Sequence, residues 1–464
     1  MKNVLEWLEA TVAKYPDKPA FSDTESSITF RQVYDIARNT GAYLVEQLGV
    51  DRTPVAVFAG RKMVTPAYFL GVVYAGRPYA PIDASLPDKR IEKILENLCP
   101  GAIVADRESR EHVESIVDEL AKAEGFDRPQ IFIAEDISRF EQVACADSNC
   151  KISESAGDAV TDSENDTDGG VVAGCAGKID DSSRDMLAVV RRQMSMTDPL
   201  YIIYTSGSTG NPKGVMTSHL SLMTYINAYC DVMHIEESDV LGNQSPLDYI
   251  AAIRDIYLPL KTGCSTAIIP KEYFMEPNAL FDYMNDKKVS SVGWSVSAFT
   301  ILTSLGAFEE VGLKSLRKIC FSGSVMPCRV LRKWQENLPE AHFVNQYGPT
   351  EATASCTYYS VDHTVEDDEV LPIGKAYDNY RVFLIDEHGN EPAVGEQGEI
   401  CVCGPILALG YYNDPERTAA AFTLNPLNRA YHERMYRTGD YGRLDEDGIL
   451  HFCGRMDRQI KHMG

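Results

Sequence analysis

The segment at residues 201–215 constrains this chain most, because a short apolar run in it gives way to glycines, hydroxyls and a single lysine. Gly207, Gly210 and Gly214 allow backbone angles at which consecutive N–H groups point at one anion. Hydroxyl donors in the same segment are Thr205, Ser206, Ser208 and Thr209. Lys213 adds a mobile positive charge that suits a phosphate group. The segment therefore predicts a loop that binds phosphate.

Two other interpretations of this segment were weighed against a phosphate site. A nucleotide-hydrolase P-loop needs a glycine, four residues and then Gly-Lys-Ser/Thr at the start of a helix. That order is absent, because Lys213 precedes Gly214 and directly follows Pro212. A plain Gly/Ser surface loop is the second interpretation. A bare linker is not expected to carry Pro-Lys-Gly straight after an apolar run, so the phosphate interpretation is favoured.

Length and composition predict a soluble, cytoplasmic protein with more than one packed subdomain. The chain has 464 residues, 44% hydrophobic and 24% charged. No apolar run reaches the length of a membrane span, and the first residues lack the apolar core of a signal peptide. The formal net charge of -24 argues against a nucleic-acid or anionic-membrane partner. The 12 cysteines are scattered without metal-ligand spacing, which favours reduced thiols over a zinc site.

Alternation of short apolar runs with helical periodicity predicts an α/β fold with parallel layers up to about residue 360. Strand-like runs at 54–58 and 318–321, for example, alternate with a helix-like stretch at 219–233. From about 361 to 456, strand-like runs separated by Gly- and Asp-rich turns predict a small β-rich subdomain. Residues 146–185 are dominated by Ser, Asp, Glu and Gly, which predicts a flexible acidic insertion.

Three further motifs follow predicted strands, where α/β ligand sites gather. They are Asn-Gln-Tyr-Gly-Pro-Thr-Glu at 345–351, Tyr-Arg-Thr-Gly-Asp at 436–440 and Gly-Arg-Met-Asp-Arg-Gln-Ile-Lys at 454–461. Together with 201–215, and with lesser motifs at 75–87 and 398–412, they resemble the adenylate-forming superfamily of acyl-CoA synthetases, luciferases and adenylation domains. The resemblance is closest to adenylation domains of nonribosomal peptide synthetases and to D-alanine–carrier-protein ligases.

The resemblance implies a luciferase-like large domain, with two layered αβ subdomains and a small distorted β-barrel. The adenylation core is expected over 1–456, with the α/β subdomains at about 1–360 and the β-rich subdomain at about 361–456. Residues 457–464 are expected to form the hinge, at Asp457 and Lys461. The small C-terminal lid that rotates about this hinge in the family is expected to be missing from this sequence.

The resemblance also implies roles in ATP and Mg²⁺ binding. Lys213, Thr350 and Glu351 are the expected catalytic residues, with Lys213 on the pyrophosphate, Thr350 on the α-phosphate and Glu351 on the metal. A single carboxylate is chemically suited to Mg²⁺, which takes one or two protein carboxylates plus phosphate oxygens. Tyr347 and Phe452 are expected over the adenine. The other expected nucleotide contacts are Thr205, Ser206, Gly207, Ser208, Thr209, Gly210, Gly323, Asn345, Gly348, Asp440 and Arg455.

Spacing relative to the family predicts the acid pocket. Its members are Tyr249, Ile250, Ala251, Arg254, Trp294, Cys320, Ser322, Gln346, Ala354 and Ser355. Ile250 stands where amino-acid-activating relatives carry an aspartate for the α-amino group, and an unpaired buried ammonium would be costly. The substrate is therefore expected to be an aryl acid, a β-amino acid or a dicarboxylate.

Two polar residues near the pocket keep alternatives open. Asp248 either reaches into the pocket or is a solvent-facing turn acid. Arg254 either pairs with a second carboxylate of the substrate or bridges Asp255 and Asp248 at the surface.

The expected reaction is ATP-dependent adenylation of a small carboxylic acid, with release of pyrophosphate. The acyl group would then pass to the phosphopantetheine thiol of a carrier protein. The alternatives are an acyl-CoA ligase and a non-catalytic nucleotide-binding module.

Overall fold

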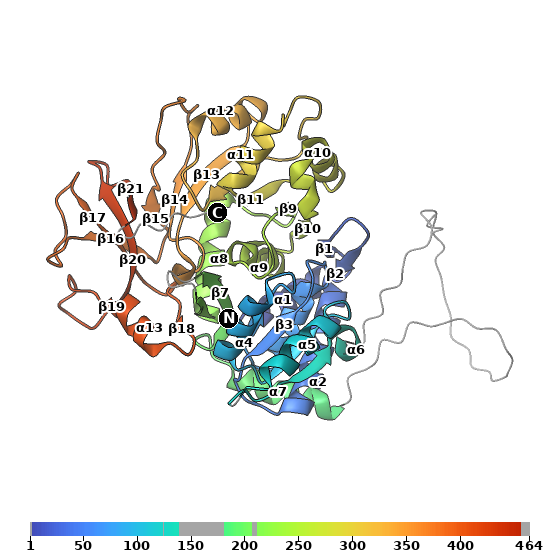
Figure 1. Cartoon of the computed structure of the whole chain (residues 1–464). Coiled ribbons are helices and arrows are strands. Elements are labelled where there is room, and N and C mark those ends of the chain that lie inside the picture. The colour runs from blue at the N-terminus through green and yellow to red at the C-terminus, as the bar shows by residue number, and fades with distance from the viewer. Residues whose placement is uncertain (1, 124, 139–180, 207–210, 456–464) are drawn as a thin grey trace.

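The computed structural model describes residues 2–123, 125–138, 181–206 and 211–455. Three β-sheets organise these residues, and Figure 1 shows the β-rich part lying beside two sheets that are covered by helices. This arrangement confirms the predicted α/β class with two layered subdomains and a smaller β-rich one. The predicted barrel is an open five-stranded sheet. No helix among the described residues is long and apolar enough to cross a membrane.

The nine-stranded sheet is parallel through its centre and has the order β15-β14-β13-β12-β11-β9-β10-β1-β2. Its strands are β1 (Pro19–Ser22), β2 (Ser27–Thr29), β9 (Val240–Asn243), β10 (Ser265–Ile268), β11 (Ser291–Ser295), β12 (Lys318–Ser322), β13 (His342–Tyr347), β14 (Thr357–Ser360) and β15 (Lys375–Ala376). The carboxyl ends of β9, β11, β12 and β13 therefore meet at one edge of the sheet, the usual place for a ligand site.

Helices cover both faces of this sheet. One face packs against α1 (Leu5–Lys14), α8 (His219–Met233) and α9 (Ile253–Thr262), and the other against α10 (Pro277–Asp286), α11 (Val296–Ser304) and α12 (Cys328–Asn337). Short 3₁₀ turns are η1 (Ile250–Ala252), η2 (Lys271–Met275) and η3 (Thr350–Ala352). Helix α8 begins after Ser218, whose Oγ accepts a hydrogen bond from the Ser221 N–H at 3.1 Å.

The seven-stranded sheet has the order β18-β8-β7-β4-β3-β5-β6. Its strands are β3 (Val55–Phe58), β4 (Tyr79–Pro81), β5 (Ala102–Ala105), β6 (Gln130–Ile133), β7 (Pro199–Ser206), β8 (Pro212–Ser218) and β18 (Gly410–Tyr411). Its helices are α2 (Phe30–Leu48), α3 (Thr65–Tyr74), α4 (Asp88–Leu98), α5 (Arg110–Leu120), α6 (Ala134–Ser138) and α7 (Asp181–Gln193). The buried sides of α4 and α5 pack on the opposite face from α2 and α3.

The β-rich part has the strand order β16-β17-β20-β19, with β21 paired to β20. It contains β16 (Arg381–Ile385), β17 (Gln397–Cys403), α13 (Pro415–Ala421), β19 (Phe422–Leu424), β20 (Arg434–Leu444) and β21 (Leu450–Arg455). All of its strand pairs are antiparallel. The two-residue strand β18 leaves this part of the chain and joins the edge of the seven-stranded sheet.

The described residues include only the end of the predicted acidic insertion. Residues 146–180 lie outside the described residues, and α7 starts at Asp181, inside the predicted range of 146–185. Helix α7 has apolar positions at helical spacing, and Leu187 and Val190 are buried in the core. The last five residues of the predicted insertion therefore lie within helix α7.

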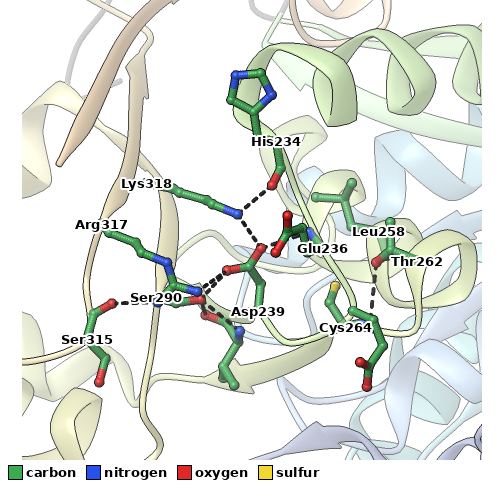
Figure 2. Close-up of polar contacts among 12 residues, drawn as sticks. His234, Glu236, Asp239, Leu258, Thr262, Cys264, Ser290, Ser315, Arg317 and Lys318 are labelled. Atoms are coloured by element: carbon green, nitrogen blue, oxygen red, sulfur yellow. Dashed lines mark hydrogen bonds and ion pairs between the residues drawn. The ribbon is translucent and has the colours of Figure 1, made fainter.

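A buried carboxylate joins the amino-terminal ends of β9, β11 and β12, on the far side of the sheet from the ligand edge (Figure 2). Asp239 Oδ2 accepts from Lys318 Nζ at 2.6 Å, and Oδ1 accepts from Ser290 Oγ at 2.7 Å and from Arg317 at 3.2 Å. Burial raises the pKa of Asp239, but the hydrogen bonds and the Lys318 charge outweigh it and hold the pKa below its ordinary value. This cluster is structural, since it lies away from the other candidate residues.

Candidate active site

The predicted phosphate segment lies between two antiparallel strands of the seven-stranded sheet. Thr205 on β7 pairs with Lys213 on β8, and Ser206 pairs with Pro212. A P-loop leads from a strand into a helix, whereas this segment leads into another strand, which excludes the P-loop alternative. Buried Thr205 Oγ1 has no hydrogen-bond partner in the described part of the chain, so it is available to a phosphate oxygen. Gly207, Ser208, Thr209 and Gly210 lie outside the described residues.

Lys213 and Glu351 meet although 138 residues separate them in the sequence. Lys213 Nζ donates to Glu351 Oε1 at 2.5 Å, and the Tyr411 hydroxyl donates to the same oxygen at 2.7 Å. Lys213 Nζ also lies 5.0 Å from the centre of the Tyr411 ring. Glu351 is 3% exposed. Both of these side-chain contacts are to the same carboxylate oxygen, Oε1.

The ionisation of Glu351 follows from these contacts. Burial alone would raise the pKa of Glu351, but the Lys213 charge and the hydrogen bonds from Lys213 and Tyr411 outweigh burial and lower it below its ordinary value. Glu351 is therefore a carboxylate at neutral pH. A buried, ionised carboxylate beside a lysine fits the Mg²⁺–phosphate chemistry expected from the sequence.

The turn after β13 brings two segments of backbone into direct contact. A Cβ at Gly348 would lie 2.4 Å from Ser355 Cα, so only glycine fits there. Thr353 and Ala354 follow with φ of 47° and 75°, a region that residues other than glycine seldom adopt. Thr353 Oγ1 donates to the Ile406 carbonyl at 2.7 Å and holds this conformation. The turn thus fixes both Thr350 and Glu351 in η3 and the pocket residues that follow.

The expected adenosine contacts form one network. The Tyr347 hydroxyl donates to Asp440 Oδ2 at 2.6 Å, and Arg455 donates to Asp440 Oδ1 at 2.7 Å. The rings of Tyr347 and Phe452 lie 6.1 Å apart and are tilted by 43°. Asn345 donates its amide to a backbone carbonyl at 2.8 Å, so its Oδ1 remains as an acceptor for an exocyclic amine. This network comes from β13, β20 and β21, and it supports but does not test the nucleotide roles.

The predicted acid pocket is centred on the buried guanidinium of Arg254, in the first turn of α9. It donates to the Gly293 carbonyl at 2.6 Å, to Gln346 Oε1 at 3.3 Å and to Cys320 Sγ at 3.5 Å. The ring of Tyr229 on α8 lies 5.6 Å from the guanidinium carbon. Since Arg254 is 2% exposed, the predicted alternative of a surface bridge to Asp255 and Asp248 is wrong. Asp255 instead accepts a hydrogen bond from Asn243 at 2.8 Å.

The structure brings several other predicted pocket residues to the same side of the sheet. Ser355 Oγ lies 3.5 Å from Gln346 Oε1, and Gln346 donates to the Tyr377 hydroxyl at 2.7 Å. Cys320 and Ser322 are two residues apart on β12 and share a face. Ala354 lies between Thr353 and Ser355 in the turn, and Gly323 follows β12 with a φ of 97°. These residues therefore gather around Arg254 and Gln346 near the carboxyl ends of β12 and β13.

Trp294 lies on the other face. Its ring packs with Phe299 and Trp334 in the core under α10–α12, and its Nε1 donates to the Gly242 carbonyl at 2.8 Å. Side chains alternate along a strand, so it is the preceding residue, Gly293, that lies against Arg254. A Cβ at Gly293 would come within 2.8 Å of the guanidinium. Gly293, and not Trp294, therefore lies beside Arg254.

The residues before η1 lie at a separate cavity of about 350 Å³. Asp248 and Tyr249 line it together with Asp83 and Arg90, and Asp248 is a half-buried residue of a turn. Burial and the neighbouring Asp83 raise the pKa of Asp248 to about 6. Ile250 is buried and lies in η1 with Ala251 (residues 250–252). Among the described pocket residues, no carboxylate therefore replaces the aspartate that amino-acid-activating relatives carry at the position of Ile250.

Sequence reasoning missed several residues of the site. Tyr411 lies within the motif at 398–412, but nothing in the pattern connected its hydroxyl to Glu351. Tyr225 and Tyr229 lie four residues apart on α8 and were assigned only to a helix, although this spacing puts both on one face. The predicted hinge residues Asp457 and Lys461 lie outside the described residues.

The family described as "AMP-binding enzyme" matches residues 8–412. A D-alanine--D-alanyl carrier protein ligase of Bacillus cereus (strain B4264) is 30% identical over 463 residues, which are 99% of this chain and 80% of that protein. The ligase of the same name from Bacillus thuringiensis (strain Al Hakam) matches with the same identity and coverage.

Solved structures share the fold at lower identity. The nonribosomal peptide synthetase FmoA3 (S1046A) aligns with a TM-score of 0.77 and 23% identity, over 98% of this chain and 42% of that chain. The N-terminal subdomain of Klebsiella oxytoca NpsA, in complex with 3-hydroxybenzoyl-AMSN, aligns with a TM-score of 0.74 and 19% identity, over 98% and 100% of the two chains. Since the family match spans most of the chain and includes the Lys213–Glu351 centre, the chain belongs to the AMP-binding enzymes of the adenylate-forming superfamily, as its motifs indicate.

Proposed function

We propose that this enzyme is an acid–thiol ligase that adenylates a small carboxylic acid with ATP and then transfers the acyl group to a carrier-protein thiol. The observation that carries the proposal is the Lys213–Glu351 centre, where a lysine and a buried carboxylate meet at the end of a hydroxyl-rich segment. A carrier protein is favoured as the acyl acceptor because the 30% identical relatives are named D-alanyl carrier protein ligases.

Binding of Mg·ATP would replace the ion pair between Lys213 and Glu351 by separate contacts of each residue with the ligand. Without nucleotide, Lys213 and Glu351 neutralise each other. With Mg·ATP, the lysine would turn to the pyrophosphate that leaves, while Glu351 would hold Mg²⁺, which supplies charge stabilisation on the phosphates. Thr350 would donate to the α-phosphate as the substrate carboxylate approaches. Catalysis would rest on positioning and charge, with no covalent enzyme intermediate.

The ribose and adenine would occupy the network around Asp440. The carboxylate of Asp440 has further lone pairs for the two ribose hydroxyls, and Arg455 holds it in place. Tyr347 is fixed by its bond to Asp440, so its ring would form a wall for the base.

Nine cysteines among the described residues are all free, which supports work in the reducing cytoplasm, where ATP is abundant.

Pyrophosphate exchange tests this function. The protein should catalyse acid-dependent exchange of labelled pyrophosphate into ATP, and a hydroxylamine trap should capture the acyl-adenylate. Lys213→Met should slow exchange by about 100-fold or more, the usual effect of removing one charge-stabilising donor. Lys18→Met is the matched control, because Lys18 forms an ion pair with Glu237 away from the site.

ATP binding without exchange for any acid would identify a non-catalytic nucleotide-binding module instead. Loading assays would separate the two thiol acceptors: transfer to a carrier protein but not to free CoA is the expected result. Transfer to CoA alone would identify an acyl-CoA ligase.

A further inference from the structure

Arg254 carries a buried positive charge that no carboxylate of the described chain pairs. Two arginines among the described residues are buried to 2% exposure, Arg77 and Arg254. Arg77 forms an ion pair with Asp51 at 2.5 Å and donates to three backbone carbonyls. Arg254 has only neutral acceptors. Arg77 is therefore paired with a carboxylate, whereas Arg254 forms no ion pair among the described residues.

The hydrogen bonds of Arg254 are also too few for its five N–H donors. The bond to the Gly293 carbonyl, at 2.6 Å, is short, whereas those to Gln346 and Cys320 are long, at 3.3 and 3.5 Å. Arg254 Nε has no partner in the described part of the chain, which is also true of Arg77 Nε, so it is the lack of a paired carboxylate that distinguishes Arg254. Nearby, the buried Tyr225 hydroxyl lies beside Ser355 and Arg254 but forms no hydrogen bond of good geometry in the described part of the chain. Buried polar groups are nearly always paired, so these donors require an explanation.

The neighbouring ionisable groups do not supply a counter-ion. Burial raises the pKa of Cys320 and of Tyr229, so both are neutral at pH 7. Asp255 is next in sequence and its charge favours the guanidinium, but its carboxylate accepts from Asn243 and forms no ion pair with Arg254. A guanidinium without a close counter-ion costs more to bury than a paired one. An anion from outside the described chain would supply such a close partner.

The position of Arg254 says which part of a substrate would reach it. Gln346, which contacts Arg254, is followed on β13 by Tyr347 of the proposed adenosine network. Ser355, beside Gln346, packs on Gly348 at the start of the turn that holds Thr350 and Glu351. An acid whose reacting carboxylate faces Thr350 would thus extend its other end toward Arg254.

We propose that the enzyme activates a small dicarboxylic acid, whose distal carboxylate is bound by Arg254. This inference rests on the proposed adenylation and names its substrate class. A planar guanidinium binds a carboxylate through two parallel N–H···O bonds, and Nε with one Nη is the side of Arg254 that has donors to spare. Tyr225 supplies a further hydroxyl donor. Ile250, in place of an acid, adds no repulsion against a second negative charge.

Pairs of acids that differ only in the distal carboxylate test the proposal. Pyrophosphate exchange should be measured with succinate against butyrate and with glutarate against pentanoate. The dicarboxylate of at least one pair should have the higher kcat/KM, by about 10⁴-fold, the scale at which a site built to hydrogen-bond a polar group rejects an analogue without it. Equal or higher kcat/KM for both monocarboxylates would overturn the proposal.

Substitution at Arg254 gives a second, independent readout. Arg254→Met should lower kcat/KM for the dicarboxylate and abolish its preference over the matched monocarboxylate, and Arg254→Lys should keep part of the preference. The thermal midpoint of Arg254→Met should stay the same or rise, because an unpaired buried charge is removed. The control Arg77→Met should lose stability and keep the preference. A fall in stability of Arg254→Met with no change in acid preference would show a structural role and refute the proposal.

Binding assays separate failure of this inference from failure of the proposed function. Calorimetry with succinate and glutarate, with and without ATP, does not require turnover. Binding that Arg254→Met removes would support the inference even if no acid supports exchange, in which case only the adenylation proposal fails. Exchange with monocarboxylates and no binding of either dicarboxylate would keep adenylation and refute the role of Arg254.

Discussion

Removing Lys213 should make the stability of this protein depend on pH in a predictable direction. Glu351 is 3% exposed and accepts hydrogen bonds from Lys213 and Tyr411. Lys213→Met would leave its charge buried with only the tyrosine bond. Breaking a fully buried pair costs about 3–5 kcal/mol. Because the Lys213 side chain keeps 23% of its exposure, we expect a loss of about 2–3 kcal/mol near pH 7.

The sign of the pH dependence follows from the pKa of Glu351 in each protein. In the wild type this pKa is lowered, so the carboxylate contributes stability above the unfolded pKa, and this contribution is lost as pH falls through the folded pKa. In Lys213→Met, burial is no longer offset by the lysine, so the folded pKa should lie above the unfolded value. The variant should then lose stability as pH rises between the two values.

Urea denaturation at about pH 4.5 and about pH 7.5 measures this effect. The difference in unfolding free energy between wild type and Lys213→Met should grow from below about 1 kcal/mol to about 2–3 kcal/mol between these conditions. Lys18→Met is the control, because its partner Glu237 is 44% exposed and its loss should be small at both values. An equal penalty at both pH values would refute the assigned role of Glu351.

Three further substitutions test other parts of the description. Asp239→Asn should cost about 3 kcal/mol near neutral pH by breaking its buried pair with Lys318, and the cost should shrink as pH falls through the lowered pKa of Asp239, measured by urea denaturation. Asp440→Asn should weaken ATP binding by about 10-fold or more in calorimetry, since a charge-assisted acceptor for the ribose is lost; unchanged affinity would contradict its role. Trp294→Phe should lower stability by about 1–3 kcal/mol and leave acid preference unchanged, whereas altered preference would return Trp294 to the pocket.

The sequence predicted local elements better than it predicted which way side chains face. Helix α8 has the predicted bounds, because its apolar positions and Ser218 cap define it from short-range information. The pocket position predicted for Trp294 belongs to the preceding residue, Gly293. A strand buried on both faces has no alternation of polar and apolar residues, so its sequence does not show which of the two side chains faces the pocket. Spacing taken from relatives predicts where a residue lies along the chain, but it does not predict on which face of the sheet the side chain lies.

The pairing of charges in the acid pocket also could not be predicted from the sequence. Helix α9 is buried over most of its length, so Arg254 cannot be assigned to solvent or core from periodicity. Whether Arg254 has a counter-ion depends on the residues of every element that packs around it. No local sequence pattern contains that information. The Lys213–Glu351 contact was implied only through a shared substrate, and Tyr411, which completes it, required the tertiary structure.

Strand β18 has a consequence for exchanging parts between relatives. Its two residues pair with β8 beside the phosphate segment, and the Tyr411 hydroxyl reaches Glu351. The chain on either side of β18 belongs to the β-rich part. A chimera joined at residue 361, the boundary that sequence texture suggests, would pair β18 of one parent with β8 and η3 of another. The compatibility of such hybrids should therefore be decided at residues 410 and 411, far along the chain from the junction itself.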